Sequence, residues 1–279
     1  MKNSQIKFTK MHGLGNDFVV IDGVTQDVEM TSELARHIGD RHFGIGCDQI
    51  LLVEPPSTPD VDFDYRIFNT DGSEVSQCGN GARCFAKFVR DRRLTGKRTI
   101  RVRTAAGIMT LEVKRNNDVT VDMGAPKFAP AEIPLLQDTE QNSYTIDVNG
   151  EAVTLSALSM GNPHGVLQVN DVNLAPVEAL GPLIESHAAF PQRVNVGFMA
   201  IKSRNEIDLR VYERGAGETL ACGSGACAAV VAGINLGLLD QEVQVRLPGG
   251  TLLINWQGRG TPVLMTGPAT TVFQGRIRI

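Results

Sequence analysis

The sequence lacks several features that mark common classes of protein. No apolar run approaches the roughly 18 residues that a membrane-spanning helix needs, and the first ten residues contain no apolar signal-peptide core. There is no Cys-x-x-Cys pair, so the usual spacing of a structural zinc site is missing. The five cysteines are an odd number, which argues against a disulfide framework. We therefore expect a cytoplasmic protein with reduced thiols and no bound metal.

A large excess of charge of either sign is absent as well. The 27 basic and 31 acidic residues give a net charge of −4, so nothing indicates a nucleic-acid or membrane partner. The densest basic run, residues 90–103, is interpreted as a solvated helix end followed by a strand face. The 279 residues, 42% of them hydrophobic, suffice for two medium-sized domains with ample cores.

The most informative feature that is present is a motif that occurs twice. The stretch "SQCGNGARCF" starts at Ser76, and "LACGSGACAA" starts at Leu220. Both contain Cys-Gly-x-Gly-Ala, which places Cys78 and Cys222 at equivalent positions separated by 144 residues (222 − 78), about half of the chain. The match extends on both sides, pairing Asn69 with Glu213, Glu74 with Glu218, and the stretch 100–113 with 243–256. The sequence therefore predicts a duplicated domain.

The pattern of the remaining segments predicts the fold class. Short stretches with β-branched residues and alternation dominate both halves, which is typical of strands: 18–22, 49–54, 64–69, 100–104, 109–114, 119–123, 193–199, 207–213, 243–247 and 251–256. Residues 224–239 are small or apolar on nearly every face, which indicates a helix buried on all sides, whereas its counterpart at 81–94 is more one-sided. We predict an α+β fold of two similar strand-rich halves, each a curved sheet around a central helix, with the active site in the cleft between them. The halves are predicted at 1–122 and 123–267, with a loop-like junction at 123–134.

Each motif places a thiol directly before a predicted helix, and this position has chemical consequences. The first backbone N–H groups of a helix lack internal partners, and together with the helix dipole they attract anions and lower the pKa of a thiol. The neighbouring glycines let a ligand approach the backbone closely. If two such devices flank the carbon beside a carboxylate, one thiolate can remove its proton while the other thiol supplies a proton to the opposite face. This pattern predicts racemisation or epimerisation of an amino acid without a cofactor.

Other interpretations of these cysteines and glycines exist. A Gly-x-Gly before a helix can bind phosphate, but neither a Gly-x-x-x-x-Gly-Lys pattern nor a clear βαβ dinucleotide unit accompanies it here. Cys47, Cys84 and Cys227 are interpreted as small buried residues. Cys78 and Cys222 could instead form a reversible redox disulfide, or the chain could bind an amino acid without moving a proton.

Long blocks of the sequence also resemble one enzyme family. The blocks run from "FTKMHGLGNDFVVID" at Phe8 to "GPATTVFQGRIRI" at Gly267, with "RHFGIGCDQILLVEP", "FDYRIFNTDGSEVSQCGNGARC", "MGNPHGVLQV", "RVNVGFM" and "VYERGAGETLACGSGACAA" between them. In this order they resemble the pyridoxal-phosphate-independent diaminopimelate epimerases. The resemblance implies an isomerase that interconverts LL- and meso-diaminopimelate in lysine and peptidoglycan-precursor biosynthesis, without a cofactor. The alternative is a cofactor-independent racemase or epimerase that acts on another amino acid.

The resemblance also assigns roles to individual residues. It implies that Cys78 and Cys222 are the acid/base pair and that His164 and Glu213 support catalysis. The residues that it implies for substrate binding are Asn16, Gln49, Asn69, Gly79, Asn80, Asn162, Asn195, Glu213, Arg214, Gly223 and Ser224. Arg214 offers a bidentate fork for the distal carboxylate of such a substrate.

The C-terminal segment departs from the family pattern at one position. The family often has a tyrosine in its dimer contact where this chain has Phe273. The apolar ring remains, so we still expect a homodimer. The family further implies that the final strand, at about 268–279, returns to the N-terminal half.

Overall fold

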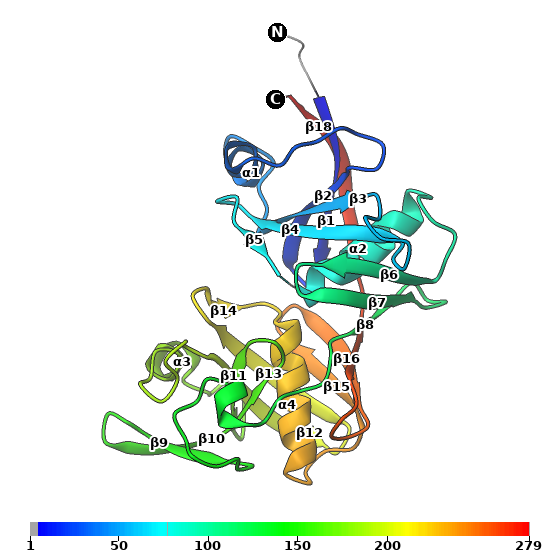
Figure 1. Ribbon diagram of the computed structural model, residues 1–279. Helices are drawn as coiled ribbons and strands as arrows, with labels where there is room; N and C mark the ends of the chain where they lie inside the picture. Colours follow the sequence, from blue (N-terminus) through cyan, green and yellow to red (C-terminus); the bar gives the residue numbers. More distant parts are fainter. Residues whose placement is uncertain (1–4, 77, 279) are drawn as a thin grey trace. The chain divides into compact units, whose positions relative to one another are not determined.

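A computed structural model describes residues 5–76 and 78–278, which divide into two compact units (Figure 1). Unit 1 contains the chain up to Val121 and again from Thr266, whereas unit 2 is the continuous stretch Asp122–Met265. Within these residues, no helix is both long and apolar enough to cross a membrane.

Unit 1 is built on a mixed sheet with both parallel and antiparallel pairs of strands. Its strands, in order across the sheet, are β18 (Thr270–Arg278), β1 (Gln5–Gly13), β2 (Asn16–Asp22), β3 (Gln49–Glu54), β4 (Phe63–Asn69), β6 (Thr99–Thr104), β7 (Gly107–Val113) and β8 (Val119–Asp122). The pairs β2–β3 and β4–β6 are parallel, and the others are antiparallel. The short strand β5 (Glu74–Val75) adds to β4 just before the first cysteine motif. The strand order therefore brings the start of β3 beside the end of β4.

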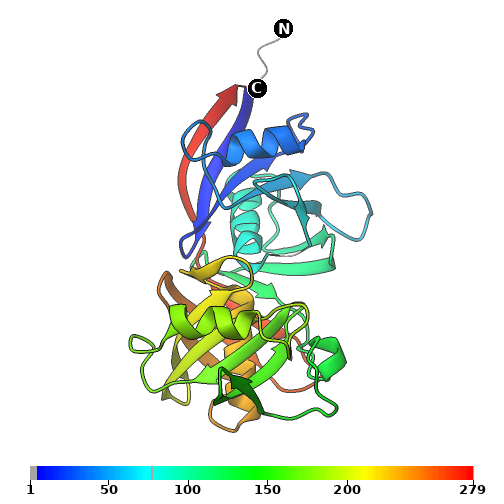
Figure 2. The same ribbon diagram turned by 90° about the vertical axis from the view of Figure 1, so that its left-hand side faces the viewer.

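Two helices pack on this sheet. Helix α1 (Ser32–Gly39) begins after Thr31, whose hydroxyl caps it, and lies against β3 and β4. Helix α2 (Gly79–Asp91) lies against β1, β2, β3 and β7 (Figure 2). It ends three residues before the expected position, because Arg93 takes a left-handed backbone with a φ of 58° and the amide of Leu94 bonds back to the carbonyl of Val89.

Unit 2 repeats the pattern of unit 1. Its strands, in order, are β9 (Tyr144–Val148), β10 (Glu151–Ser159), β11 (Pro163–Gln168), β12 (Asn195–Ser203), β13 (Glu206–Glu213), β15 (Glu242–Leu247) and β16 (Gly250–Trp256). From β10 to β16 the pairs are antiparallel, parallel, antiparallel, parallel and antiparallel, the same series that β1, β2, β3, β4, β6 and β7 show in unit 1. Strand β14 (Gly217–Thr219) pairs with β13 as β5 pairs with β4. The predicted α+β fold of two similar strand-rich halves is thus confirmed.

Helix α4 (Gly223–Asn235) occupies the centre of unit 2. It contacts β10, β11, β12, β13, β15 and β16, and its residues 225–232 are all buried, as an all-round apolar helix predicts. The expectation that it continues to Leu239 is wrong. Gly237, with a φ of 73°, ends the helix, and Leu239 folds back onto Gly233.

In each unit, an arginine–glutamate ion pair fixes the short strand that precedes the cysteine. Arg66 of β4 bonds both carboxylate oxygens of Glu74 in β5, each at 2.9 Å. Arg210 of β13 bonds both oxygens of Glu218 in β14, at 2.6 and 2.7 Å. These residues occupy equivalent positions of the repeat, and each pair fixes the chain just upstream of a cysteine motif.

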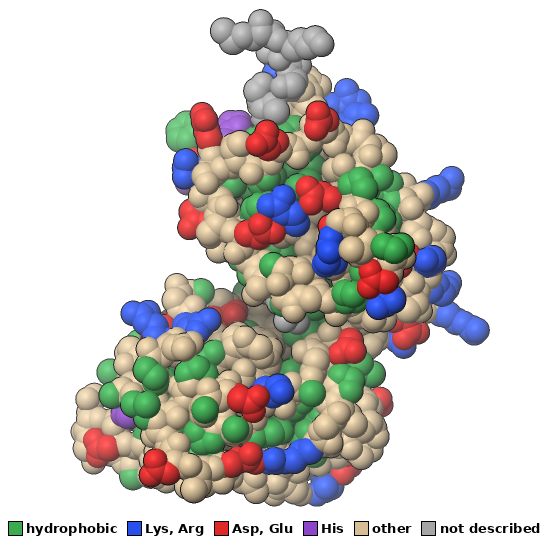
Figure 3. Space-filling model, viewed as in Figure 1, with side chains coloured by type: hydrophobic (Ala, Val, Ile, Leu, Met, Phe, Trp, Pro, Cys, Tyr) green, Lys and Arg blue, Asp and Glu red, His purple; other side chains and the backbone are tan. Residues whose placement is uncertain are grey.

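The remaining elements cover unit 2 and connect the units. The stretch 123–134 is largely irregular, as expected, and contains only the short 3-10 helix η1 (Pro130–Glu132). Helix α3 (Val177–Glu185) packs on β12, β13 and β14, where Gly181 lets the ring of Tyr212 approach closely. Strand β17 (Val263–Gly267) leads toward β18. On the face drawn in Figure 3, basic and acidic side chains are interspersed.

Candidate active site

Cys78 forms the N-terminal cap of α2 in unit 1. Its backbone is extended, with φ −148° and ψ 109°, and its sulfur accepts a hydrogen bond from the amide of Gly81 at 3.4 Å. Its carbonyl accepts from the amide of Ala82 at 2.9 Å, the first hydrogen bond of the helix. The thiol is partly exposed. Cys78 therefore lies where the unpaired amides of a helix end can stabilise a negative charge.

The polar residues that the resemblance implies for unit 1 gather near this cap. Asn80, in the first turn of α2, donates to the side-chain oxygen of Asn16 at 3.3 Å. Gln49 and Asn69 face each other across β3 and β4, and their side chains bond at 3.1 Å. Phe18 of β2 pairs with Gln49, so the starts of β2 and β3 lie at the same edge of the sheet as the end of β4. The structure thus brings together two contacting pairs of amide side chains in unit 1.

A network of charges holds Asn16 in place. The amide of Asn16 donates to a carboxylate oxygen of Asp48 at 2.9 Å, and Arg41 bridges Asp48 to Asp17 at 2.8 and 2.9 Å. Lys10, which is buried, pairs with Asp17 at 2.5 Å. Burial acts to raise the pKa of Asp17, but its bonds to Arg41 and Lys10 outweigh this and lower it to about 2. Asp17 therefore stays ionised, and the loop that carries Asn16 is fixed.

Cys222 stands at the N-cap position of α4, as Cys78 does at that of α2, but its side chain makes no capping hydrogen bond and its sulfur has different neighbours. The thiol donates to a carboxylate oxygen of Glu213 at 3.1 Å, and the other oxygen of Glu213 accepts from the hydroxyl of Thr219 at 2.5 Å. The hydroxyl of Ser224 lies 3.7 Å from the sulfur. Burial, and after it the charge of Glu213, raises the pKa of Cys222 well above its usual range. Cys222 is therefore held as a protonated thiol.

His164 is buried beside the other predicted residues of unit 2. Its Nε2 lies 3.0 Å from the side-chain oxygen of Asn162, and the amide of Asn162 donates to Ser224 at 3.4 Å. Burial, with a smaller effect of Arg214, lowers the pKa of His164 to about 3. The imidazole is therefore neutral at ordinary pH and orients Asn162 rather than carrying a charge.

Asn195 connects the remaining predicted residues of unit 2. It is buried, donates to the carbonyl of Pro163 at 2.9 Å, and accepts from the backbone amide of Arg214 at 3.0 Å. The guanidinium of Arg214 bonds the carbonyl of Gln192 at 3.1 Å. Gly79 and Gly223 are the first residues of α2 and α4, directly after the cysteines.

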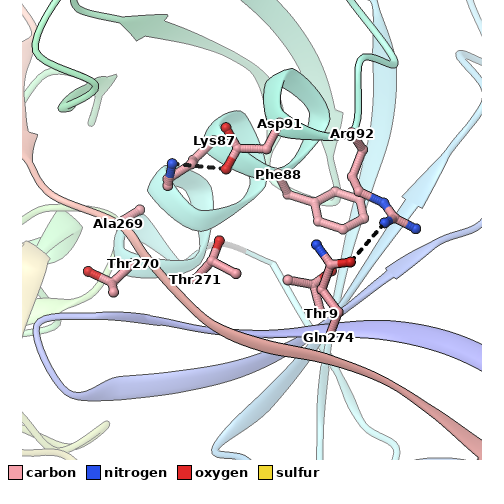
Figure 4. Close-up of a pocket in the computed structure, with 9 residues that line it drawn as sticks. All are labelled: Thr9, Lys87, Phe88, Asp91, Arg92, Ala269, Thr270, Thr271 and Gln274. Carbon is pink, nitrogen blue, oxygen red and sulfur yellow. Dashed lines mark hydrogen bonds and ion pairs between the residues drawn. The ribbon is translucent and has the colours of Figure 1, made fainter.

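A surface pocket of about 360 Å³ in unit 1 contains none of the predicted residues (Figure 4). It lies between α2, β1 and β18. Its charged groups already have partners, since Lys87 pairs with Asp91 at 2.9 Å and Arg92 donates to Gln274 at 3.3 Å. It therefore does not compete with the cysteine motifs as the candidate site.

Comparison with known proteins decides the family. A family model described as diaminopimelate epimerase matches residues 8–129 and 156–272. A protein of Teredinibacter turnerae named diaminopimelate epimerase is 59% identical over 275 residues, which cover 99% of this chain and 100% of that protein. The chain belongs to the diaminopimelate epimerase family. It is accordingly an isomerase. A diaminopimelate epimerase of Stutzerimonas stutzeri is also 59% identical, over 98% of this chain and 99% of that protein.

Solved structures show that diaminopimelate epimerases share their fold with other proteins. A hydroxyproline epimerase from Agrobacterium vitis matches with a TM-score of 0.71 at 15% identity, covering 99% of this chain and 93% of that one. A phenazine biosynthesis protein of the PhzF family from Bacillus anthracis matches with a TM-score of 0.70 at 16% identity, covering 99% of this chain and 100% of that one. At these identities the likeness concerns the fold alone.

Sequence reasoning missed three residues that hold the predicted side chains. Asp48 bonds Asn16, Ser73 accepts from Asn69 at 3.0 Å, and Thr219 bonds Glu213. Asp48 directly precedes Gln49, and Thr219 lies three residues before Cys222, so both lie inside the sequence blocks that resemble the family. Their position in those motifs was the available signal.

Proposed function

We propose that this protein interconverts LL- and meso-diaminopimelate by moving one α-proton between two thiols. In this mechanism Cys78 and Cys222 act on opposite faces of the same α-carbon. The observation that carries the proposal is the repeated geometry, in which each cysteine caps the N-terminus of a central helix in one of two matching strand frameworks. Two acid/base groups on opposite faces of a carbon can invert it, because one removes the proton while the other supplies a proton to the opposite face.

The hydrogen bonds of the two sulfurs favour different resting states. The Cys78 sulfur accepts a backbone N–H, which suits a thiolate, whereas Cys222 donates to Glu213, which suits a thiol. In one direction Cys78 removes the α-proton and Cys222 returns a proton to the other face. In the reverse direction the two cysteines exchange roles. The negative charge of Glu213 then destabilises the Cys222 thiolate until the sulfur of Cys222 is protonated again.

The substrate is proposed to be held by groups from both motifs. The backbone amides at Gly79, Asn80, Gly223 and Ser224 stabilise the negative charge that develops on the carboxylate beside the reacting carbon. Arg214 binds the distal carboxylate, and the distal ammonium finds acceptors among amide side chains and backbone carbonyls. The side chains proposed for this polar shell are Asn16, Gln49, Asn69, Asn162 and Asn195. Such a shell discriminates against amino acids that lack the second polar end, because its groups would remain unpaired.

We further propose that the protein acts in the cytoplasm as a homodimer and without a cofactor. Phe273 and Val272 support the dimer, since both are apolar and about half exposed on β18 (47% and 55%). A chelator or a carbonyl-trapping reagent is expected to leave turnover unchanged. Sensitivity to the carbonyl reagent would instead indicate pyridoxal phosphate.

Proton NMR of the reduced protein with LL-diaminopimelate in deuterated water tests the proposal. Loss of the α-proton signal together with formation of the meso isomer is the expected result. Cys78→Ala and Cys222→Ala should each abolish interconversion while circular dichroism remains that of the folded protein. No exchange by the folded, reduced protein would reject this substrate, and near-normal turnover by either variant would reject the two-thiol mechanism. The same assay with other amino acids separates a related racemase from a protein that only binds.

A further inference from the structure

Glu185, the last residue of helix α3, has a buried carboxylate that the proposed reaction does not use. Its side chain is 8% exposed, and its Oε1 accepts from the backbone amide of Gly215 at 3.0 Å and from the guanidinium of Arg193 at 3.2 Å. The side chain of Arg193 is 59% exposed, and ion pairs of such exposed groups contribute little stability. Burying a carboxylate is unfavourable unless its oxygens accept hydrogen bonds. The bond to Gly215 is therefore the contact that needs an explanation.

Gly215 is the third residue of a tight turn at the end of strand β13. The turn runs from Glu213 to Ala216 and is closed by the amide of Ala216, which donates to the carbonyl of Glu213 at 3.1 Å. Within residues 213–216, all of which the structure describes, only Gly215 has a positive φ, at 75°. This is the pattern of a type II turn, which favours glycine at its third position. Arg214 is the second residue of the same turn.

The orientation of the central peptide distinguishes this turn from the commoner type I turn. The central peptide contains the carbonyl of Arg214 and the amide of Gly215, and it faces opposite ways in the two types. The carboxylate of Glu185 accepts from the amide in the observed orientation. A rotated peptide would instead direct a carbonyl oxygen at the same negative charge. Glu185 therefore favours the type II form of the turn.

Further hydrogen bonds attach Arg214 to the loop that follows α3. Asn195 accepts from the backbone amide of Arg214 at 3.0 Å, and the guanidinium of Arg214 donates to the carbonyl of Gln192 at 3.1 Å. This loop is itself tied to the end of α3, because the amide of Val194 donates to the carbonyl of Glu185 at 3.1 Å. Glu185 thus holds the turn with its side chain and the neighbouring loop with its backbone.

The equivalent turn of unit 1 has a different backbone and no arginine. It runs from Asn69 to Gly72, and the amide of Gly72 donates to the carbonyl of Asn69 at 3.0 Å. Its positive φ lies on the fourth residue, Gly72, at 91°, and Thr70 occupies the place of Arg214. The type II geometry therefore accompanies the arginine.

We propose that Glu185 is a positioning residue for Arg214. Its carboxylate fixes the turn Glu213–Ala216, so the guanidinium is already oriented before the distal carboxylate of the substrate binds. A group that is held in place beforehand binds more tightly, because less freedom is lost on binding. The inference rests on the proposed role of Arg214 in substrate binding. Glu213 depends less on Glu185, since it also pairs with Gly217 of β14.

The test measures hydrogen exchange of the Gly215 amide by NMR on protein labelled with 15N-glycine. The amide should be protected in the wild type. Glu185→Leu removes the acceptor, and Glu185→Asp keeps the charge but shortens the side chain by one methylene, so exchange should be about tenfold faster in both. Glu185→Gln keeps an acceptor at the same length and should remain close to the wild type. A purely electrostatic role would give the reverse order for the Asp and Gln variants.

The same variants are then compared in turnover of diaminopimelate. KM should rise about tenfold in Glu185→Leu and Glu185→Asp with kcat within about twofold, whereas Glu185→Gln should behave like the wild type. Glu178→Leu is the matched control, since Glu178 is an exposed residue of the same helix. It should match the wild type in both measurements.

Unchanged exchange at Gly215 in Glu185→Leu, or in Glu185→Asp if the first variant does not fold, would overturn the inference. Faster exchange with an unchanged KM would also overturn it, because Arg214 would then not depend on the turn. If exchange is faster but the wild type does not turn over diaminopimelate, the proposed function fails, whereas the fixing of the turn by Glu185 stands.

Discussion

At the scale of single residues, one difference between the repeats separates the two thiols. Asn69 and Glu213 occupy equivalent positions, but Asn69 bonds Gln49 and Ser73, whereas Glu213 accepts a hydrogen bond from the thiol of Cys222. The duplication places a thiol directly before each central helix, and in unit 2 the carboxylate of Glu213 favours the protonated form of the thiol. A cysteine pair with complementary protonation can start a proton transfer without prior rearrangement.

Replacing Glu213 tests how the carboxylate acts on Cys222. In Glu213→Gln the charge that raises the pKa of Cys222 is removed, so this pKa should fall, although burial still keeps it high. We expect at least a tenfold loss of turnover, since the hydrogen bond that fixes the thiol is weakened. Thiolate absorbance at 240 nm in a Cys78→Ala background measures the titration. Glu242→Gln, an exposed position, is the control, and an unchanged Cys222 titration in Glu213→Gln would contradict the assignment.

His164 should make the protein sensitive to acid. Its pKa is lowered from 6.5 to about 3 in the folded state, so between these values the unfolded chain binds a proton that the folded protein does not. Stability therefore falls as the pH drops below 6.5, by at most about 1.4 kcal/mol per pH unit. Asp17 adds a similar loss only below 3.8.

The measurement is urea unfolding of the wild type and of His164→Gln between pH 4 and 7. The variant should lose less stability over this range than the wild type. Parallel curves for the two proteins would show that His164 does not control the acid response.

The predicted site residues illustrate what sequence alone can give at this scale. Motifs placed Cys78 and Cys222 next to helix starts, and the structure confirms both as helix caps. The bond between Asn16 and Asp48 joins positions 32 residues apart, and no local pattern encodes such a contact. Individual hydrogen bonds depend on the packing of whole strands, which explains why they could not be predicted.

At the scale of elements, the central helix α4 depends on small residues. Gly233 lets Leu239 fold back across the end of the helix, since an added Cβ would lie only 2.3 Å from a methyl group of that leucine. Leu239 is 3% exposed, so its side chain is packed closely against other atoms of the unit.

Gly233→Ala should therefore lower the free energy of unfolding by about 1 to 3 kcal/mol, although alanine is the better helix former. Denaturant unfolding measures the change. Gly96→Ala, where nothing lies within 4 Å of the added atom, should be neutral. Adding Leu239→Ala to the Gly233→Ala variant should relieve the overlap, so the double variant should be more stable than the sum of the two single changes predicts.

Strands with β-branched alternation were predicted from sequence, whereas others were missed. The stretches 49–54 and 207–213 match β3 and β13 closely. Strand β10 was missed because the sequence "EAVTLSALS" ends in serine, alanine and leucine, which give weak strand signals. Helix α3 was missed because it contains Gly181 and Pro182, which are unfavourable in a helix. The structure shows that Gly181 allows the close contact with Tyr212, which the sequence does not reveal.

At the scale of the whole molecule, the duplication explains why one framework appears twice in a single chain. Both units have the same series of strand pairs. Both also have an arginine–glutamate ion pair before the cysteine. The repeat could be inferred from the motifs, because an exact spacing of 144 residues (222 − 78) links many positions. The return of β18 to unit 1 could be inferred only from the family resemblance, because a local sequence pattern does not identify the strand with which another strand pairs.

The proposed dimer leads to a prediction about Phe273. Its ring packs edge-on against Phe8 at 5.9 Å and leaves 47% of the residue exposed. Phe273→Ser should convert a wild-type dimer largely to monomer in sedimentation velocity, because interfaces depend on buried aromatic side chains. Phe43→Ser, which changes a residue that is 86% exposed elsewhere in unit 1, should remain dimeric. A wild-type monomer, or a dimer that both variants retain, would contradict the prediction.

The pairing of β18 with β1 also sets the order in which the chain can fold during translation. Strand β1 leaves the ribosome well before its neighbour β18, because Gly13 at the end of β1 precedes Thr270 at the start of β18 by 257 positions (270 − 13). Unit 2 is continuous and can fold as soon as Met265 has emerged, whereas unit 1 must wait for the C-terminal strand. At 5–20 residues per second, synthesis of the intervening residues takes roughly 13 to 51 s. During this time the outer edge of β1 has no partner strand, so nascent or truncated chains should be the forms of this protein that need chaperones most.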